Sequence, residues 1–224
     1  MKRALIVVAK EPQAGQTKTR LTPPLEPHQA AALYRCLMLD TFQLMARVPG
    51  VDAVISFAPD TAEAYFRAIA PDGFHLVPQR GSDLGERLDN VLREHLNDGY
   101  AQAVVMNSDG PTLPTELVAL AFHTLDDPLV DVVLGPSEDG GYYLIGLKIP
   151  CGHLFDLTMS TPRVLQETTA RACEAGLNVA LLSSWYDIDR WEDVLKMAAD
   201  LERLPAHEAS HTRRFLAELN SWCP

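Results

Sequence analysis

Lysine, arginine and aspartate side chains are concentrated in turns that directly follow apolar stretches of this sequence. Lys10, Lys18 and Arg20 lie in one short segment after the apolar residues 4–9, although the formal net charge of the chain is -11. Asp109 occupies the same kind of position after another apolar run. Lys and Arg neutralise phosphate groups, and carboxylate oxygens hold hard divalent cations such as Mg²⁺. These residue types therefore predict a site for a phosphate ester and a metal ion, if the fold brings the turns together.

The basic segment begins where a buried strand has to end. Residues 4–9 are apolar and β-branched at their centre, which is typical of a strand covered on both faces. Pro12 removes a backbone donor and Gly15 permits a turn, so neither residue continues the strand. We therefore expect Gly15 and the three cations to form a loop that binds phosphate. A solvated surface loop is the alternative that this segment leaves open.

The spacing of apolar residues predicts an alternation of strands and helices along the whole chain. Strands are expected at about 51–57, 74–78, 101–107, 131–136, 142–147 and 179–182, and helices at about 29–48, 60–70, 84–97, 115–125, 162–175, 191–203 and 213–219. Strands separated by helices form a mostly parallel sheet with helices on both faces, a three-layer Rossmann-like α/β arrangement. The short turn between the fifth and sixth strands predicts that the sixth strand is antiparallel.

A parallel sheet binds its ligands beyond the carboxyl ends of its strands. The loops that follow the first, third, fourth and fifth strands should therefore meet at one edge. Besides the basic loop, this edge collects the segment Gly81, Ser82 and Asp83 and the pair Ser108 and Asp109. We expect these glycine, serine and aspartate residues to contribute to nucleotide binding.

Asp109 and Asp189 are the predicted metal ligands. Asp109 lies at the ligand edge, and its alternative roles are a turn residue before Pro111 or a helix cap. For Asp189, a role as the N-cap residue of the last major helix is an equally plausible alternative. We expect Asp109 and Asp189 to hold Mg²⁺ or Mn²⁺, with phosphate oxygens completing the coordination. Without nucleotide, the two carboxylates should repel one another, so the loss of one charge should leave the protein equally stable or more stable.

The acidic turn Glu138, Asp139, Gly140 and Gly141 is the predicted acceptor site. It lies between two later strands, and its glycines allow the backbone to approach a ligand closely. A plain hairpin turn is the alternative. Asp139, together with Asp109 and Lys18, is our candidate for a catalytic role.

Length and composition exclude several classes of protein. The 224 residues suit one domain, with a core at about 4–200 and a helical extension at 205–224, and 47% of them are hydrophobic. The sequence lacks a run of about 18 apolar residues, which a membrane-spanning helix would need. The first apolar stretch ends at charged residues directly after residue 9, which argues against a signal peptide. We therefore expect a cytoplasmic protein. The acidic balance argues against nucleic acid as a partner. The four cysteines lack metal-binding spacing, and no P-loop or GxGxxG motif follows the first strand.

Five segments together resemble a known superfamily. AKEPQAGQTKTRL, GSDLGERL, NSDGPTLP, GPSEDGGYYLIGL and DIDRWEDV are similar to the nucleotide-diphospho-sugar transferases of the GT-A fold, over about residues 4–200. The nearest resemblance is to a small bacterial glycosyltransferase-like family with some members in arsenosugar or radical-SAM gene clusters. Molybdenum cofactor guanylyltransferases and 2-phospholactate guanylyltransferases are more distantly similar.

The resemblance implies roles for residues that match its motifs. The basic first loop of these families contacts nucleotide phosphates, which here implies Lys10, Lys18 and Arg20. The aspartate after the fourth strand binds the metal, which implies Asp109, and a late aspartate often completes the site, which implies Asp189. The late motif departs from the usual pattern because Arg-Trp follows Asp189 in place of Thr-Pro. A single aspartate also replaces the DxD of many glycosyltransferases.

Three functions remain open at this point. The first is a metal-dependent glycosyltransferase that moves a sugar from a nucleotide-sugar donor to a small-molecule acceptor. The second is a nucleotidyltransferase that couples a nucleoside triphosphate to a small phosphorylated or carboxylated acceptor. The third is a non-catalytic nucleotide-binding domain. The sequence does not predict which base, sugar and acceptor are used, and it does not predict the oligomeric state.

Overall fold

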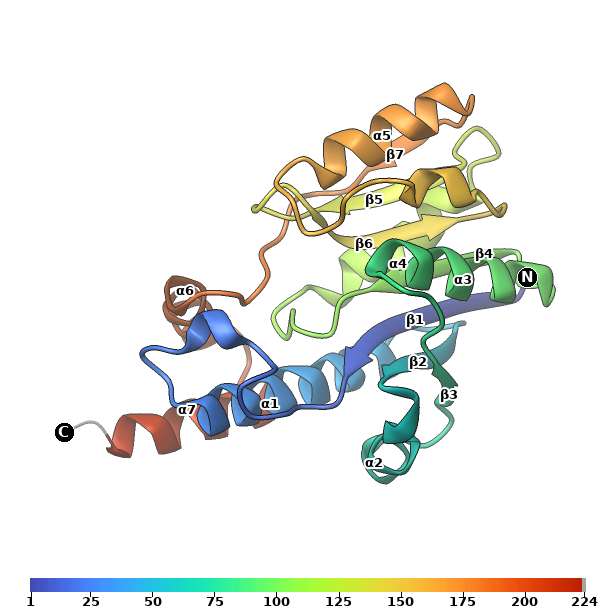
Figure 1. Ribbon diagram of the computed structural model, residues 1–224. Helices are drawn as coiled ribbons and strands as arrows, with labels where there is room; N and C mark the ends of the chain where they lie inside the picture. Colours follow the sequence, from blue (N-terminus) through green and yellow to red (C-terminus); the bar gives the residue numbers. More distant parts are fainter. Residues whose placement is uncertain (223–224) are drawn as a thin grey trace.

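A seven-stranded sheet organises the computed structural model, which describes residues 1–222 (Figure 1). The strands are β1 (Arg3–Lys10), β2 (Asp52–Ala58), β3 (His75–Pro78), β4 (Gln102–Met106), β5 (Val132–Pro136), β6 (Tyr142–Leu147) and β7 (Val179–Leu181), and their order in the sheet is β3-β2-β1-β4-β6-β5-β7. The predicted strands are all present, and each of their bounds agrees with the prediction to within one residue. The mostly parallel α/β arrangement is therefore confirmed.

Helices connect the strands and cover both faces of the sheet. They are α1 (Pro27–Ala46), α2 (Glu63–Ile69), α3 (Leu84–Asn97), α4 (Thr115–Asp126), α5 (Val164–Glu174), α6 (Trp191–Arg203) and α7 (Ser210–Trp222), with short 3₁₀ turns η1 (Thr19–Leu21), η2 (Asp60–Ala62) and η3 (Gly152–Phe155). Within residues 1–222, no helix combines the length and apolarity that crossing a membrane requires.

The sixth strand is antiparallel, as the short turn before it predicts. β6 pairs antiparallel with both β4 and β5, whereas β1 pairs parallel with β2 and β4. The turn after β5 closes when the backbone N–H of Ser137 donates to the carbonyl of Gly141 at 2.9 Å. Because this turn reverses the chain, residues 137–141 lie near the carboxyl end of β4.

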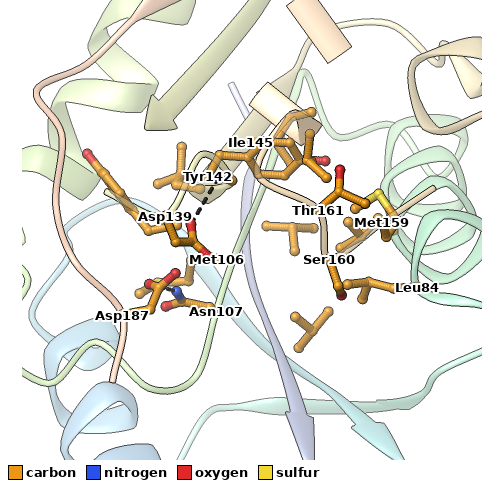
Figure 2. Close-up of a pocket in the computed structure, with 17 residues that line it drawn as sticks. Leu84, Met106, Asn107, Asp139, Tyr142, Ile145, Met159, Ser160, Thr161 and Asp187 are labelled. Atoms are coloured by element: carbon orange, nitrogen blue, oxygen red, sulfur yellow. Dashed lines mark hydrogen bonds between the residues drawn. The ribbon is translucent and has the colours of Figure 1, made fainter. Parts of the chain in front are cut away.

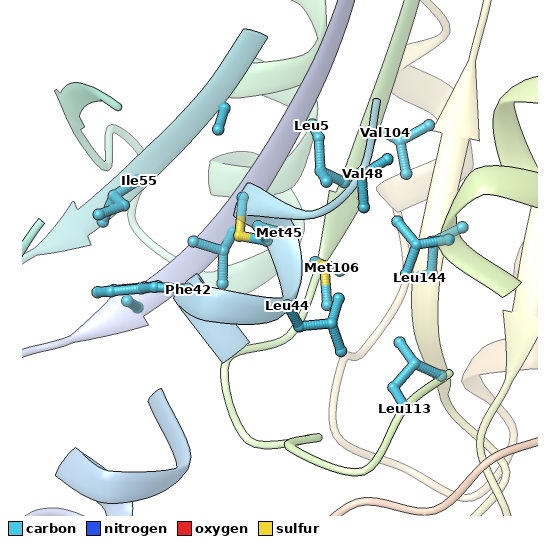
Figure 3. Packing of buried hydrophobic residues seen from close by; sticks show 14 of the residues in the cluster. Leu5, Phe42, Leu44, Met45, Val48, Ile55, Val104, Met106, Leu113 and Leu144 are labelled. Atoms are coloured by element: carbon cyan, nitrogen blue, oxygen red, sulfur yellow. The ribbon is translucent and has the colours of Figure 1, made fainter. Parts of the chain in front are cut away.

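Alternating side chains of β1 supply the core on both sides. Leu5 and Val7 join the cluster beneath α1, α2 and α4, while Ala4 and Ile6 join the cluster beneath α3 and α5. Figure 3 shows the first cluster, in which Phe42 of α1 lies against the sheet. Burying each side chain of this size contributes about 1.5–3 kcal/mol, which keeps the ends of β1 and β4 side by side.

A third apolar cluster joins the helices at the two ends of the chain. Leu33 and Leu37 of α1 pack with Met197 and Leu201 of α6 and with side chains of α7. This packing holds the segment before α6 against the loop that follows β1.

Candidate active site

Lys18 is the central charged group at the carboxyl edge of the sheet. Its ammonium donates hydrogen bonds to Asp109 Oδ2 and, at 2.8 Å, to Asp189 Oδ1. Arg20 donates to the other oxygen of Asp189 at 3.1 Å. The Lys18 side chain is only 8% exposed. The structure thus brings together four residues that the sequence predicted to lie at one site.

The loop after β1 folds back on itself and places Lys18 between the two aspartates. The backbone N–H of Gln13 donates to the Thr17 hydroxyl at 3.0 Å, and the N–H of Thr17 returns to the Gln13 carbonyl. Lys18 adopts a left-handed backbone with φ 50°, a conformation that residues other than glycine rarely take. Leu21, which is fully buried, anchors the next turn in the apolar cluster of α1 and α6.

Tyr34 of α1 connects the basic loop with the end of β4. Its hydroxyl accepts from the backbone N–H of Lys10 at 3.1 Å and hydrogen-bonds to the Ser108 hydroxyl at 2.7 Å. Asp109 follows directly, and its Oδ1 atom is buried without a hydrogen-bond partner in the described residues. The side chain therefore caps no turn or helix here, and one carboxylate oxygen is available to a ligand.

Asp189 is not the cap of α6. Arg190 is the N-cap residue, and Asp193 in the first turn completes a capping box, because its carboxylate accepts from the backbone N–H of Asp189 at 3.0 Å and from that of Arg190 at 2.7 Å. These bonds hold the extended segment before the helix. Both Asp189 side-chain oxygens are engaged by the basic loop instead.

Asp187 also belongs to the site, although the sequence reasoning assigned it no role. Its carboxylate accepts hydrogen bonds from the Asn107 amide and, at 2.7 Å, from the Ser137 hydroxyl. Side chains two residues apart on an extended segment point to the same side. The spacing of Asp187 and Asp189 was therefore a signal that could have identified Asp187.

Burial and neighbouring charges perturb the pKa values of these groups. Burial raises the pKa of Asp187 to about 7, and the nearby Asp109 carboxylate adds to the effect. For Lys18, burial favours the neutral amine, but the Asp109 and Asp189 carboxylates outweigh it and raise the pKa of the ammonium. For Asp189, burial is likewise outweighed by Lys18, which lowers the pKa of the carboxyl.

The expectation that Asp109 and Asp189 face one another unpaired is wrong. The Lys18 ammonium lies between them and compensates both charges. The sequence reasoning placed Lys18 on a phosphate, so it did not consider a contact with the carboxylates.

Two of the cavities that open at this edge adjoin one another and differ in charge, and a third, of about 420 Å³, lies between Asp187, Asp139 and the arginines Arg20 and Arg190. The basic cleft, of about 490 Å³, is lined by Lys10, Lys18, Arg20 and Arg87, together with Asp109 and other residues of the same loops. The acidic cavity, of about 180 Å³, has Asp139 and Asp187 on one side and apolar side chains over most of the remainder (Figure 2).

Several predicted site residues have structural partners here. The Asp83 carboxylate caps α3 by accepting from the Glu86 N–H at 2.9 Å, and the Ser82 hydroxyl donates to the Glu86 carboxylate. Gly81 and Gly15 form turns with positive φ. None of these four predicted residues lines the basic cleft, so nucleotide binding by them stays a prediction, whereas Lys10, Lys18, Arg20 and Ser108 do line it.

The residues of the predicted acceptor turn differ in whether they line the acidic cavity. Asp139 and Gly141 line the acidic cavity, and the Asp139 carboxylate accepts from the Gly141 N–H at 3.0 Å. Glu138 turns outward and pairs with Lys196 at 2.7 Å. Gly140 packs against Pro162, where a Cβ atom would lie 2.0 Å from the carbonyl oxygen.

The residues around Lys18 fit a divalent cation held by few protein ligands. Asp109 and Asp189 both contact the Lys18 ammonium, whose place a cation bound by both would have to take, and Asp109 Oδ1 lacks a partner among the described residues. No group of three or more His, Cys, Asp or Glu residues suited to a metal occurs in the described part of the chain. A cation here would therefore take one or two carboxylates, and phosphate and water would supply the rest, which is how Mg²⁺ is usually bound.

Comparison with known proteins relates the whole chain to nucleotide-using transferases. The profile of a family described as "uncharacterized protein conserved in bacteria (DUF2064)" matches residues 41–161. A crystal structure from Desulfovibrio desulfuricans G20, proposed to be a nucleotide-diphospho-sugar transferase, is 31% identical with a TM-score of 0.88 and covers 99% of this chain and 96% of that chain.

Two relatives have assigned activities. A phosphoenolpyruvate guanylyltransferase of Nocardia farcinica is 27% identical over 98% of this chain and 92% of its own length. A 2-phospho-L-lactate guanylyltransferase of Methanothermobacter thermautotrophicus is 26% identical over 90% of this chain and 85% of its own length. These matches support the predicted resemblance at the level of the superfamily.

Proposed function

Because the chain belongs to the DUF2064 family, and because its ligand edge is built for phosphate, we propose that it is a nucleotide-dependent transferase. The observation that carries this proposal is the buried Lys18, which lies between Asp109 and Asp189 and lines the basic cleft with them. Cations and carboxylates that meet at one point suit a nucleotide diphosphate with a divalent ion. The similarity to nucleotide-using transferases over nearly the full length adds support.

Each charged residue has a distinct task in this proposal. Lys10, Lys18 and Arg20 bind the donor phosphates, and Asp109 and Asp189 hold Mg²⁺ or Mn²⁺. The bound cation supplies charge neutralisation at the phosphate oxygens of the leaving group. Lys18 exchanges a carboxylate partner for a phosphate oxygen when the donor binds. Preorganised charges of this kind stabilise the charge that develops in the transition state.

Glycosyl transfer from a nucleotide-sugar is the mode that we propose first. The bond between the anomeric carbon and the diphosphate oxygen breaks, an acceptor hydroxyl bonds to that carbon, and a carboxylate takes the hydroxyl proton. Asp139 and Asp187 line the adjoining cavity and are positioned for this last task. The relative of highest identity named above, at 31%, is itself proposed to be a nucleotide-diphospho-sugar transferase.

Nucleotidyl transfer is the second candidate, and the two guanylyltransferase relatives favour it. In this mode, an acceptor oxygen bonds to the α phosphorus, the bond between the α and β phosphates breaks, and pyrophosphate leaves. The basic cleft would serve a nucleoside triphosphate equally well. The two modes differ in the leaving group, which makes them easy to separate by experiment.

The test is a turnover assay with Mg²⁺ and two sets of donors. Nucleoside triphosphates and nucleotide-sugars are supplied with a panel of small acceptors, and pyrophosphate and nucleoside diphosphate are quantified. Release of nucleoside diphosphate supports glycosyl transfer, and release of pyrophosphate supports nucleotidyl transfer. Asp109→Asn should abolish metal-dependent nucleotide binding, whereas Asp72→Asn, at an exposed position outside both cavities, should retain it. Absence of nucleotide binding by the unmodified protein would refute the proposal.

A further inference from the structure

The acidic cavity contains no cationic side chain. Among the described residues that line it, Asp139 and Asp187 are the charged ones, and Lys, Arg and His are absent. Its remaining surface is mainly apolar, with Leu84, Met159 and Ile145 among the side chains that Figure 2 places around it. A phosphate or carboxylate group placed here would meet two carboxylates and no compensating charge.

The cations that lie beside this cavity do not line it: Lys18 and Arg20 belong to the basic cleft, and Arg190 lines a neighbouring cavity on the other side of Asp139 and Asp187. Lys18 pairs with Asp109 and Asp189, and Arg20 pairs with Asp189. Lys196 holds Glu138, which points away from this cavity. A bound donor would draw Lys18 and Arg20 further towards its own phosphates, so neither cation would be free to receive a second anion.

The polar atoms in the cavity instead suit hydroxyl groups. Asp139 and Asp187 line the cavity, and a carboxylate oxygen accepts hydrogen bonds but does not donate them. The Asp187 carboxylate already accepts from the Asn107 amide. A ligand hydroxyl can donate to either carboxylate, and its carbon skeleton can cover the apolar wall.

The cavity lies where the second substrate of a transferase must bind. Val8, Asn107, Leu84 and Ser160 line both this cavity and the basic cleft, so the two spaces adjoin. A hydroxyl held by Asp187, whose carboxylate accepts from the Asn107 amide, is therefore next to the donor phosphates, as the transfer of a group between two substrates requires.

We propose that the acidic cavity binds the acceptor and that the acceptor is an uncharged, hydroxyl-bearing molecule with an apolar face, not a phosphate or a carboxylate. The inference rests on the proposed transferase function and adds the class of the acceptor. It separates this chain from its two guanylyltransferase relatives, whose names specify the anionic acceptors phosphoenolpyruvate and 2-phospho-L-lactate.

The charge of the cavity can be measured without knowledge of either substrate. Met159→Cys places a thiol in the acidic cavity, and Gln16→Cys places one in the basic cleft. Each variant is treated with an uncharged and with an anionic methanethiosulfonate reagent, and peptide mass spectrometry follows each cysteine separately. Taking the ratio of the two rates at one thiol removes the effect of that thiol's own pKa and exposure.

The expected ratio of anionic to uncharged rates is at least about tenfold lower at Met159→Cys than at Gln16→Cys. Adding Asp187→Asn to Met159→Cys should raise this ratio, because a carboxylate is removed. Equal ratios at the two sites would overturn the proposal while leaving the transferase function intact. Failure of nucleotides to protect Gln16→Cys from labelling would instead count against the transferase function.

Two further experiments identify which substrate binds in the acidic cavity. UDP-glucose and GDP-mannose are added in turn, and the donor that protects Gln16→Cys should leave Met159→Cys reactive. Protection of both thiols would show that the donor sugar, which is also uncharged and hydroxylic, fills the cavity, and this would refute its assignment to the acceptor. In turnover assays, glycerol and glucose should be better acceptors than their phosphomonoesters, and preference for a phosphomonoester would overturn the proposal.

Discussion

Lys18 compensates two carboxylates that approach one another from distant parts of the chain. Its side chain is 8% exposed, and Asp109 and Asp189 are its partners. In proteins, removing one member of a buried ion pair is strongly destabilising, because the remaining charges stay buried without compensation. Lys18 therefore contributes to stability as well as to the proposed phosphate binding.

Lys18→Met is expected to change both properties. The free energy of unfolding should fall by about 1–3 kcal/mol because the carboxylates lose their shared donor. Nucleotide affinity should fall about ten- to a hundredfold, since a charge-assisted hydrogen bond contributes about 1.5–3 kcal/mol. Urea denaturation and isothermal titration calorimetry measure the two effects.

Lys10→Met is the matched control for this prediction. Lys10 lines the same cleft, but it is exposed and forms no ion pair within the described residues. Its loss should weaken nucleotide binding without lowering stability. Equal stability of the two variants would contradict the structural role that we assign to Lys18.

At the level of elements, the turn between β5 and β6 sets the position of the loop before α5. Gly140 has φ +91° and packs directly on the Pro162 backbone. The loop beyond it carries Met159, Ser160 and Thr161 into the acidic cavity. A change at Gly140 therefore reaches the cavity through the backbone.

Gly140→Ala is expected to impair turnover more than nucleotide affinity. The added Cβ would overlap the Pro162 carbonyl, so the loop has to move, and the left-handed backbone adds about 1–2 kcal/mol of strain. Gly73→Ala carries the same backbone strain at φ +84° but has nothing within 4 Å of the added atom. A comparison of unfolding free energies and kinetics of the two variants isolates the effect of the overlap, and identical behaviour would contradict it.

Asp40 joins α1 to the start of α7. Its side chain is 3% exposed and accepts from the backbone N–H of His211 at 3.0 Å and of Thr212 at 2.7 Å. The first N–H groups of a helix have no partner within the helix, and a carboxylate at this end is also favoured by the helix dipole.

Asp40→Ala should lower the free energy of unfolding by about 1–3 kcal/mol, because two buried donors lose their partner. Asp40→Asn keeps one acceptor oxygen and should cost less. Amide hydrogen exchange within α7 should accelerate in Asp40→Ala, while nucleotide affinity stays unchanged because α7 does not line the basic cleft. Unchanged exchange would show that other contacts hold the helix.

At the scale of the whole molecule, an acidic protein presents one basic cleft. The formal net charge is -11, yet Lys10, Lys18, Arg20 and Arg87 line the same cavity. Self-repulsion of the acidic surface disfavours binding of free anions, so the local cations and a metal ion have to compensate for it.

We expect Mg²⁺ and nucleotide together to raise the melting temperature more than either one alone. A ligand that binds only the folded protein adds about 2.7 kcal/mol of stability at a hundred times its Kd. Differential scanning calorimetry with Mg²⁺, with nucleoside diphosphate and with both tests this expectation, and EDTA should reverse the joint effect. An equal gain from nucleotide alone would argue against a metal ion at Asp109 and Asp189.

Local residue patterns are sufficient to predict the elements and the edge of the sheet at which the candidate site lies. Apolar residues recur at helical or strand spacing in each segment, and these local patterns predict the observed elements to within a few residues. The short turn at 137–141 predicts the antiparallel β6, because five residues can only reverse the chain. The edge follows from a general property of parallel sheets, which requires no side-chain detail.

The pairing of the charges, by contrast, follows from the three-dimensional fold. Lys18 contacts Asp109 and Asp189, which lie 91 and 171 positions away in the sequence, and Asp187 contacts Asn107, 80 positions away. Such contacts depend on strand order, on the path of the loop after β1 and on the capping box that Asp193 completes at α6. The separation of a basic cleft from a cavity without cations has the same origin, because the charge of a cavity depends on which side chains the packed elements direct into it.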